Sequence, residues 1–270
     1  MPRAEIIIIG NEILAGDVRD ANGHYLCRQI TGLGGEVTRA ATVGDRVEDI
    51  GREVRSALER GPDLLLTAGG MGPTADDRTL EAVAAATDRP LEENADALDM
   101  VRRKYQALAA EGSVQSADLT DSRRKMAQLP RGGEPLPNPV GAAPGVLLRA
   151  GATTIVCLPG VPAELEGIFE GALEPVLRQV FGDGAIAEET LIVDTGDESL
   201  LAPVLEQVQR DCPEVYVKSR PHGFGPRVKI RVVLSARGTS RAKAQKRLQH
   251  GRAALVAALD RAGLSLATPQ

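Results

Sequence analysis

The first part of the chain alternates short apolar runs with stretches of helical periodicity. Strand-like runs occupy Glu5–Ile9, Glu36–Thr42 and Asp63–Thr67. Between them, apolar residues recur every three or four positions, which is the spacing of one helix face. The residues that set this spacing are Leu26, Ile30 and Leu33 in the first stretch and Val47, Ile50, Val54 and Leu58 in the second. Strands that alternate with helices predict a parallel sheet covered on both faces.

The segments that follow extend the same domain. A long helix is expected before Gly112, because glycine suits the position just beyond a helix end. Its inward stripe consists of Leu98, Val101, Tyr105 and Leu108. Val146–Leu148 and Thr154–Leu158 predict a closing hairpin. One last helix is expected from about Pro162 to Val180, since proline suits a first helical turn.

A change in charge and a glycine-rich break predict a second, smaller domain. The net charge of −5 hides an acidic excess in residues 1–185 and a net positive charge in residues 186–270. Gly182-Asp183-Gly184 lies close to this change. We therefore expect domains over residues 1–183 and 184–270. The second reads β-α-β-β-α, an α+β order, in the segments Thr190–Asp194, Glu198–Gln209, Val215–Lys218, Val228–Leu234 and Arg241–Ala262.

Composition narrows the class of protein. The 270 residues are 43% hydrophobic and 26% charged, which is typical of a soluble globular protein. No apolar run approaches the roughly 20 residues that span a bilayer, and the N-terminus leads directly into a strand. Cys27, Cys157 and Cys212 are isolated and fit core packing in a reducing compartment better than catalysis. We expect a cytoplasmic protein with no membrane partner.

The strongest candidate for chemistry is the segment Thr67–Thr79, which joins a strand to a helix. In open sheets, ligands bind beyond the C-terminal ends of parallel strands. Gly69, Gly70 and Gly72 let the backbone approach a ligand, and the helix N-terminus behind them favours phosphate. The sequence Gly-Lys-Ser/Thr is absent, so the turn is not a P-loop.

Acidic residues at the same sheet edge have both a functional and a structural interpretation. Those concerned are Glu12, Asp17, Asp20, Asp45, Asp76 and Asp77. Thr74-x-x-Asp77 fits a capping box, although a cap leaves the neighbouring carboxylate unexplained. Asp45-x-x-Glu48 by itself favours a helix cap. For the residues after the first strand, a metal or ribose contact and an N-cap by Asp20 or Asn22 are equally supported.

Two loops rich in proline and glycine complete the predicted edge. Pro137–Gly145 fits either a rigid pocket edge or a plain surface connection. Leu158–Glu164 is a strand-to-helix turn whose N–H groups can meet an anion, while Glu164 also fits a first helical turn. Carboxylates beside anion-binding turns suggest a divalent cation that substrate phosphates help to bind, which allows diphosphate cleavage. His24, His222 and His250 are scattered and are not expected to bind a metal.

Five motifs in order resemble the molybdopterin-binding domain superfamily of MoaB/Mog type. The detailed form is more similar to the competence/damage-inducible protein A family. The motifs are Gly10-x-Glu12-Ile13-Leu14-x-Gly16-x-x-x-Asp20-x-Asn22, the acidic Asp45, Gly70-Met71-Gly72-Pro73-Thr74-x-Asp76-Asp77-x-Thr79, Asn138-Pro139-x-Gly141-x-Ala143-Pro144-Gly145 and Leu158-Pro159-Gly160-Val161-Pro162-x-Glu164. The resemblance implies a three-layer α/β/α domain with a mostly parallel sheet, followed by a KH-like α+β domain.

The same resemblance implies a function and a set of site residues. It implies hydrolysis of ADP-ribose to AMP and ribose 5-phosphate with a divalent metal (Mg, Mn or Co). The alternative is a molybdopterin-binding protein of molybdenum cofactor biosynthesis without this activity. The implied catalytic residues are Asp77, Asp76 and Asp45, and the implied metal ligands are Asp77, Asp45, Glu12 and Asp20. The implied phosphate-binding residues are Gly69, Gly70, Gly72, Thr74, Asn138, Gly141, Gly145, Pro159 and Gly160.

The expected partners and the role of the second domain rest on weaker sequence signals. We expect a nucleotide or pterin ligand and a homo-oligomer. Basic residues cluster in the second domain at Lys218, Arg220, Arg227, Lys229 and Arg231. The loop His222–Pro226 lacks the GxxG of RNA-binding KH domains, so nucleic acid is disfavoured against an oligomer contact or a lid. The family's nicotinamide-nucleotide amidase domain is expected to be absent, because the chain ends at Gln270.

Overall fold

The computed structural model describes residues 1–220 and 229–267. The chain divides into two compact units. The first comprises residues 1–31 and 35–181, and the second comprises residues 32–34 together with those from 182 onward. Each unit has its own hydrophobic core. In the described residues, no helix is both long and apolar enough to cross a membrane.

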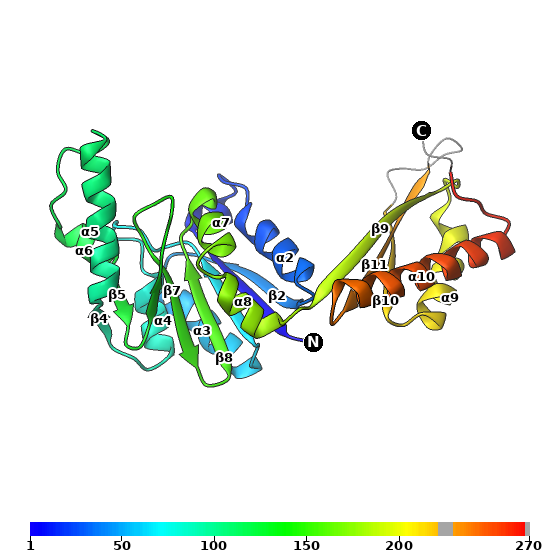
Figure 1. The fold of residues 1–270 in the computed structure, drawn as a ribbon, viewed down its shortest axis with the longest axis horizontal. Helices are drawn as coiled ribbons and strands as arrows, with labels where there is room; N and C mark the ends of the chain where they lie inside the picture. The colour runs from blue at the N-terminus through cyan, green and yellow to red at the C-terminus, as the bar shows by residue number, and fades with distance from the viewer. Residues whose placement is uncertain (221–228, 268–270) are drawn as a thin grey trace. The chain divides into compact units, whose positions relative to one another are not determined.

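A six-stranded sheet forms the centre of the first unit (Figure 1), with the strand order β2-β1-β3-β8-β7-β6. Its strands are β1 (Arg3–Ile9), β2 (Glu36–Val43), β3 (Leu64–Ala68), β6 (Glu134–Leu136), β7 (Gly145–Ala150) and β8 (Thr153–Leu158). The pairs β1–β2, β1–β3 and β3–β8 are parallel, whereas β7 and β6 add an antiparallel edge. The predicted, mostly parallel sheet and the closing hairpin are confirmed.

Helices cover both faces of this sheet (Figure 1). On one face, α3 (Val47–Arg60) and α4 (Thr79–Ala86) contribute side chains to the buried cluster that includes Ile7 and Leu65. On the other face lie α2 (Asn22–Gly32), α7 (Pro162–Glu170) and α8 (Glu174–Phe181). β1, β3 and β8 are buried almost throughout, as expected of strands covered on both sides.

The helix predicted over residues 162–180 is in fact two helices. α7 ends at Glu170, and Gly171 has a non-helical backbone with φ −107° and ψ −88°. Pro175 then occupies the first turn of α8, where its missing N–H costs nothing. A continuous helix would place that proline ring against the Gly171 carbonyl, so the break has a local steric cause.

The segment between β3 and β6 builds an outlying part of the first unit. α5 (Ala95–Ala110) begins at Asn94, whose side chain accepts the Ala97 N–H at 2.9 Å. Gly112 follows its end with φ 74°, so the predicted glycine stop is confirmed. The remaining elements are the short α1 (Asn11–Ala15) and α6 (Asp121–Lys125) and the two-stranded ribbon of β4 (Leu91–Glu93) and β5 (Gln128–Pro130).

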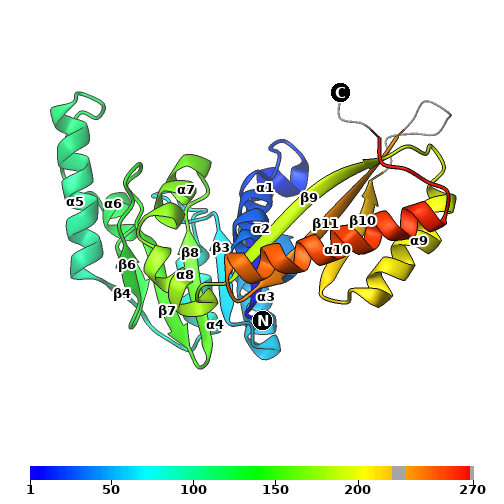
Figure 2. The same ribbon diagram turned by 45° about the vertical axis from the view of Figure 1, so that its right-hand side comes forward.

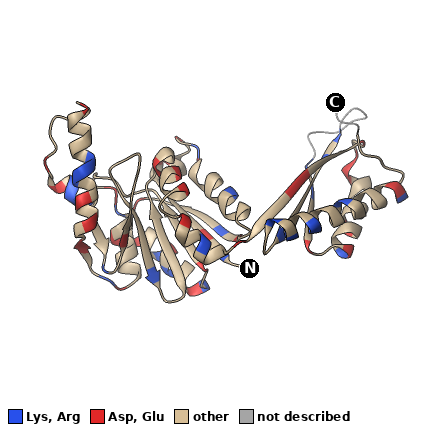
Figure 3. Ribbon diagram, viewed as in Figure 1, with Lys and Arg blue, Asp and Glu red and all other residues tan. Residues whose placement is uncertain are grey.

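The second unit confirms the predicted β-α-β-β-α order. Its elements are β9 (Ala185–Val193), α9 (Glu198–Asp211), β10 (Val215–Arg220), β11 (Ile230–Gly238) and α10 (Arg241–Arg261). The antiparallel sheet has the order β10-β11-β9, and α9 and α10 cover one of its faces (Figure 2). Basic residues recur along α10 (Figure 3). The KH-like identity of this unit stays a prediction.

The basic residues predicted in this unit have separate surroundings. Lys218, Arg220 and Arg231 are exposed on the sheet, and Lys229 lies 3.9 Å from the Asp194 carboxylate. Arg227 and the loop His222–Pro226 lie outside the described residues.

Candidate functional site

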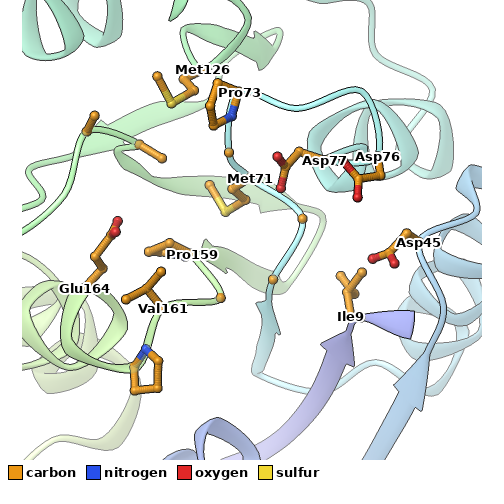
Figure 4. Close-up of a pocket in the computed structure, with 18 of the residues that line it drawn as sticks. Ile9, Asp45, Met71, Pro73, Asp76, Asp77, Met126, Pro159, Val161 and Glu164 are labelled. Atoms are coloured by element: carbon orange, nitrogen blue, oxygen red, sulfur yellow. The ribbon is translucent and has the colours of Figure 1, made fainter. Parts of the chain in front are cut away.

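A cavity of about 570 Å³ opens at the C-terminal ends of the parallel strands (Figure 4). It lies where the rule for open sheets places a ligand. Its lining comes from the end of β1 and the segment after it, from the loops after β2, β3 and β8, and from the loop before β7. Residues of α5, the residue after α6 and the first turn of α7 complete it. The lining residues are Ile9, Gly10, Glu12, Asp45, Gly69, Gly70, Met71, Gly72, Pro73, Asp76, Asp77, Tyr105, Met126, Ala142, Ala143, Pro159, Gly160, Val161, Pro162 and Glu164.

The glycine turn after β3 is built by contacts that no side chain would allow. Gly69 and Gly70 have φ values of 113° and 63°. A Cβ on Gly69 would meet the Ile9 carbonyl oxygen, and one on Gly70 would meet the Thr79 hydroxyl. Thr79 holds the turn closed: its hydroxyl donates to the Gly69 carbonyl at 2.7 Å, and its N–H donates to the Gly70 carbonyl at 3.0 Å.

The sequence predicted that the N-terminus of the helix behind this turn meets the ligand, but that N-terminus does not line the cavity. Thr79, the first residue of α4, is fully buried and donates its N–H to Gly70. The cavity is lined instead by residues 69–73 of the turn itself. Any anion bound here would therefore meet the backbone of the turn and not the N-terminus of α4.

Asp76 and Asp77 lie together at one end of the cavity (Figure 4). The Thr74 hydroxyl contacts carboxylate oxygens of both, and Asp77 also accepts the Thr74 N–H at 2.9 Å. One hydroxyl has one proton, so it cannot donate to both carboxylates at once. Hydrogen bonding to this hydroxyl lowers the pKa of Asp76 below its ordinary value. The pair is thus a concentration of negative charge that a cation would stabilise.

Neither Asp77 nor Asp45 caps the helix that follows it. Asp77 does make one bond of the predicted capping box, since it accepts the Thr74 N–H, but the turn that this bond closes is not the start of α4. α4 starts after Asp77, with Arg78 at its N-cap position and no side-chain cap. α3 has Arg46 at its N-cap position, again without a side-chain cap. Asp45 instead accepts the N–H of Asn11 at 2.9 Å, which ties the loop after β2 to the loop after β1. Both carboxylates line the cavity.

The four predicted metal ligands do not form one cluster. Glu12 lines the main cavity and also a small adjoining one. Asp20 lines only the adjoining cavity and accepts the Gly23 N–H at 2.8 Å, near the start of α2. Among the described residues, no three His, Cys, Asp or Glu side chains lie close enough to hold a metal. A cation here would need ligand oxygens to complete its coordination.

Four of the predicted phosphate-binding residues do not line the cavity; these are Thr74, Asn138, Gly141 and Gly145. Thr74 holds the two aspartates, as described above. Asn138 organises its loop: its amide donates to the Ala143 carbonyl at 2.8 Å, and its oxygen accepts the Gly141 N–H at 2.8 Å. Gly145 is buried within β7, where an added Cβ would press against Ile168, so its role is packing. Pro159 and Gly160 do line the cavity.

The residue pattern missed an apolar wall of the cavity. Met71, Tyr105, Met126, Ala142 and Ala143 line it. Most of these side chains belong to one small cluster that links α5 to the residue after α6 and to the loop before β7. The apolar spacing along α5 predicted that Tyr105 faces inward. It could not show that this face lines a cavity, because the spacing is the same for a helix that packs only against the core.

Arg123 and Lys125 also support the site, and neither was predicted. The Arg123 guanidinium carbon lies 3.7 Å from the centroid of the Tyr105 ring, a cation–π contact. The same side chain donates to the carbonyls of Ser116 at 2.8 Å and Asp118 at 2.7 Å. The Lys125 ammonium donates to the Thr74 carbonyl, which places a positive charge beside the acid pair.

Among the described residues, no cysteine or histidine lines this cavity. Complete burial raises the pKa of Cys157 to about 11, so its thiol stays protonated near neutral pH. Cys27 and Cys212 are free thiols that do not line the cavity, and burial raises the pKa of both. His24 and His250 are exposed, and His222 lies outside the described residues.

Replacing Thr79 by valine tests what holds the glycine turn. The change removes the hydroxyl but keeps the side-chain shape, so the buried Gly69 carbonyl loses a donor. We expect the free energy of unfolding to fall by about 1–3 kcal/mol in denaturant titrations. Thr79→Ser keeps the hydroxyl and is the matched control. Equal stability of the valine variant and the wild type would show that this bond does not hold the turn.

Replacing Thr74 by valine tests the cause of the Asp76 pKa shift. Without the donor, the pKa of Asp76 should rise toward its ordinary value, so the carboxylate takes up its proton at a higher pH. An NMR titration of the Asp76 carboxyl carbon measures this directly. Thr74→Ser should keep the low pKa. A pKa that stays low in the valine variant would contradict the assignment.

Comparisons with known proteins identify the family of the first unit. The family model described as "Probable molybdopterin binding domain" matches residues 5–179. A protein from Aeropyrum pernix is 46% identical over 247 residues, covering 90% of this chain and 89% of the relative. A second, from Pyrobaculum calidifontis, is 41% identical over 239 residues, covering 87% and 88%.

One solved structure adds a match in three dimensions. It is described as the protein CinA with unknown function from Thermoplasma acidophilum, and it is 37% identical with a TM-score of 0.59. The match covers 65% of this chain and 98% of that one. From the match to residues 5–179 and the sheet that carries the cavity, we conclude that the chain belongs to the molybdopterin-binding domain family.

Proposed function

We propose that the cavity binds a phosphorylated pterin of the molybdopterin type together with a divalent cation. The observation that carries this proposal is the presence of two unlike kinds of lining in one cavity. The glycine turn and the carboxylates of Asp45, Asp76 and Asp77 supply the polar lining, and the side chains of the apolar wall supply the rest. A ligand with a flat ring and a phosphate tail matches both kinds of lining, and family membership supports the pterin.

The carboxylates suit a hard cation that is shared with the ligand. Asp45 and Asp77 each use one oxygen to accept a backbone N–H, which fixes the side chain and leaves the other oxygen available. Mg²⁺ is commonly bound through one or two carboxylates, with phosphate oxygens and waters completing its shell. Such a cation neutralises phosphate charge and polarises a phosphoryl oxygen. The chain's own part is to orient the phosphate on the turn and to exclude water along the apolar wall.

A second candidate function is hydrolysis of ADP-ribose. This reaction cleaves the diphosphate and gives AMP and ribose 5-phosphate. The observation that favours it is the acid pair at Asp76 and Asp77, which exceeds what phosphate binding alone requires. An aspartate there can orient a water molecule toward a phosphoryl group. A cytoplasmic homo-oligomer remains part of the proposal for either function.

Asp77→Asn tests the first candidate. The amide keeps one oxygen acceptor for Thr74 but removes the charge, so the free energy of unfolding should change by no more than about 1 kcal/mol. Affinity for a phosphorylated pterin, measured by calorimetry with Mg²⁺, should fall at least tenfold. Asp96→Asn, at an exposed position in the first turn of α5, is the matched control. Binding that is unaffected by both Asp77→Asn and EDTA would contradict the cation site.

AMP formation from ADP-ribose tests the second candidate. We expect AMP only with Mg²⁺, Mn²⁺ or Co²⁺, and its loss in Asp77→Asn, because the cation and the acid pair act together. Chromatography of the products measures both. An absence of AMP in the wild type, together with tight pterin binding, would leave the first candidate alone.

A further inference from the structure

Glu164 has an unusual place in the cavity. Figure 4 shows it across the cavity from Asp45, Asp76 and Asp77, with Met71 and Pro159 between. Its carboxylate therefore does not belong to the acidic end, where a cation and phosphate are proposed. Its labelled neighbours in Figure 4 are the apolar residues Pro159 and Val161, which also line the cavity.

The Glu164 carboxylate is held in a fixed position. One of its oxygens, Oε2, accepts the Asn138 amide N–H at 2.7 Å. The carboxylate also packs over Gly141, where an added Cβ would collide with both oxygens. Among the described residues, Glu164 forms no ion pair. A carboxylate held in this way at the cavity surface can accept hydrogen bonds from a bound ligand.

Carboxylate chemistry selects the class of ring. An ionised carboxylate only accepts hydrogen bonds, and each oxygen can accept two. A 2-amino-4-oxopyrimidine edge, as in pterin and guanine, presents a ring N–H beside an amino group, which are two parallel donors. The corresponding edge of adenine presents an amino donor beside a ring nitrogen that carries a lone pair. That lone pair would face a carboxylate oxygen and repel it.

We propose that Glu164 is the residue that selects a 2-amino-4-oxopyrimidine ring over adenine in this cavity. The inference rests on the proposed binding of a phosphorylated ring compound. It adds the recognition of the ring, for which Asn138 acts as a positioning residue. It also favours pterin or guanine compounds over ADP-ribose as ligands.

A ribose hydroxyl pair is the competing partner for Glu164, since acidic residues often bind sugars in this way. The surroundings favour a ring, because the labelled neighbours of Glu164 in Figure 4, Pro159 and Val161, are apolar. The two alternatives predict different results for nucleotides that share ribose and phosphate but differ in the base. GMP and AMP form such a pair.

The test compares neopterin monophosphate, GMP and AMP in the presence of Mg²⁺. Pterin fluorescence reports binding without interference, because the chain contains no tryptophan. GMP and AMP are measured by displacement of the pterin. We expect the wild type to bind the pterin and GMP at least tenfold more tightly than AMP, as a charge-assisted hydrogen bond contributes a factor of this size or more.

Glu164→Gln turns one acceptor into a donor while its amide oxygen can still accept from Asn138. We expect it to weaken the pterin and GMP at least tenfold, and to leave AMP unchanged or tighter. Glu166→Gln, exposed on the same helix and outside the cavity, should match the wild type. Circular dichroism and a thermal melt check that each variant is folded.

The outcomes separate the two proposals. Equal affinity of the wild type for GMP and AMP overturns the role of Glu164, even if the pterin binds. An equal loss of all three ligands in Glu164→Gln also overturns it, because that result indicates a ribose contact or a structural role. If the wild type binds none of the three, the proposed function fails as well.

Discussion

The close approach of the turn after β3 to the end of β1 is the constraint on which the site depends. The Gly69 backbone packs against the Ile9 carbonyl, and Thr79 fixes both glycine carbonyls from behind. This contact brings the loops after β1 and β3 to one edge, where Asp77 lines the cavity. Asp45, in the loop after β2, reaches the same cavity and is tied to the loop after β1 through the Asn11 N–H. Glycine is required there by contact with backbone atoms, whatever ligand is bound.

Much of the fold could be predicted because strand and helix patterns are local. The buried runs of β1 and β3 and the periodicity of α3 each lie within a single segment. The break at Gly171 was missed because the apolar pattern continues across it. The relevant signal was Pro175, whose ring excludes one continuous helix.

The site was predicted less completely, and the reasons are physical. Motifs at strand ends identified the glycine turn, because the sheet topology brings such ends together. For Asp45 the local pattern favoured a helix cap, and only the family resemblance marked it as a site residue. Local spacing cannot tell a cap from a ligand-facing carboxylate, since both follow a strand and precede a helix. Asp20 lies outside the main cavity, and Tyr105 and Met126 reach it from distant segments. Their placement depends on tertiary packing that no short motif contains.

The contact between Arg123 and Tyr105 bears on how the shape of this cavity can vary among related proteins. The arginine anchors the connection between α5 and α6 through two carbonyls and lies over the Tyr105 ring, which lines the cavity. Insertions in that connection would tilt the aromatic surface while sparing every motif at the strand ends. Ligand preference can therefore drift by loop replacement alone, under an unchanged set of signature residues.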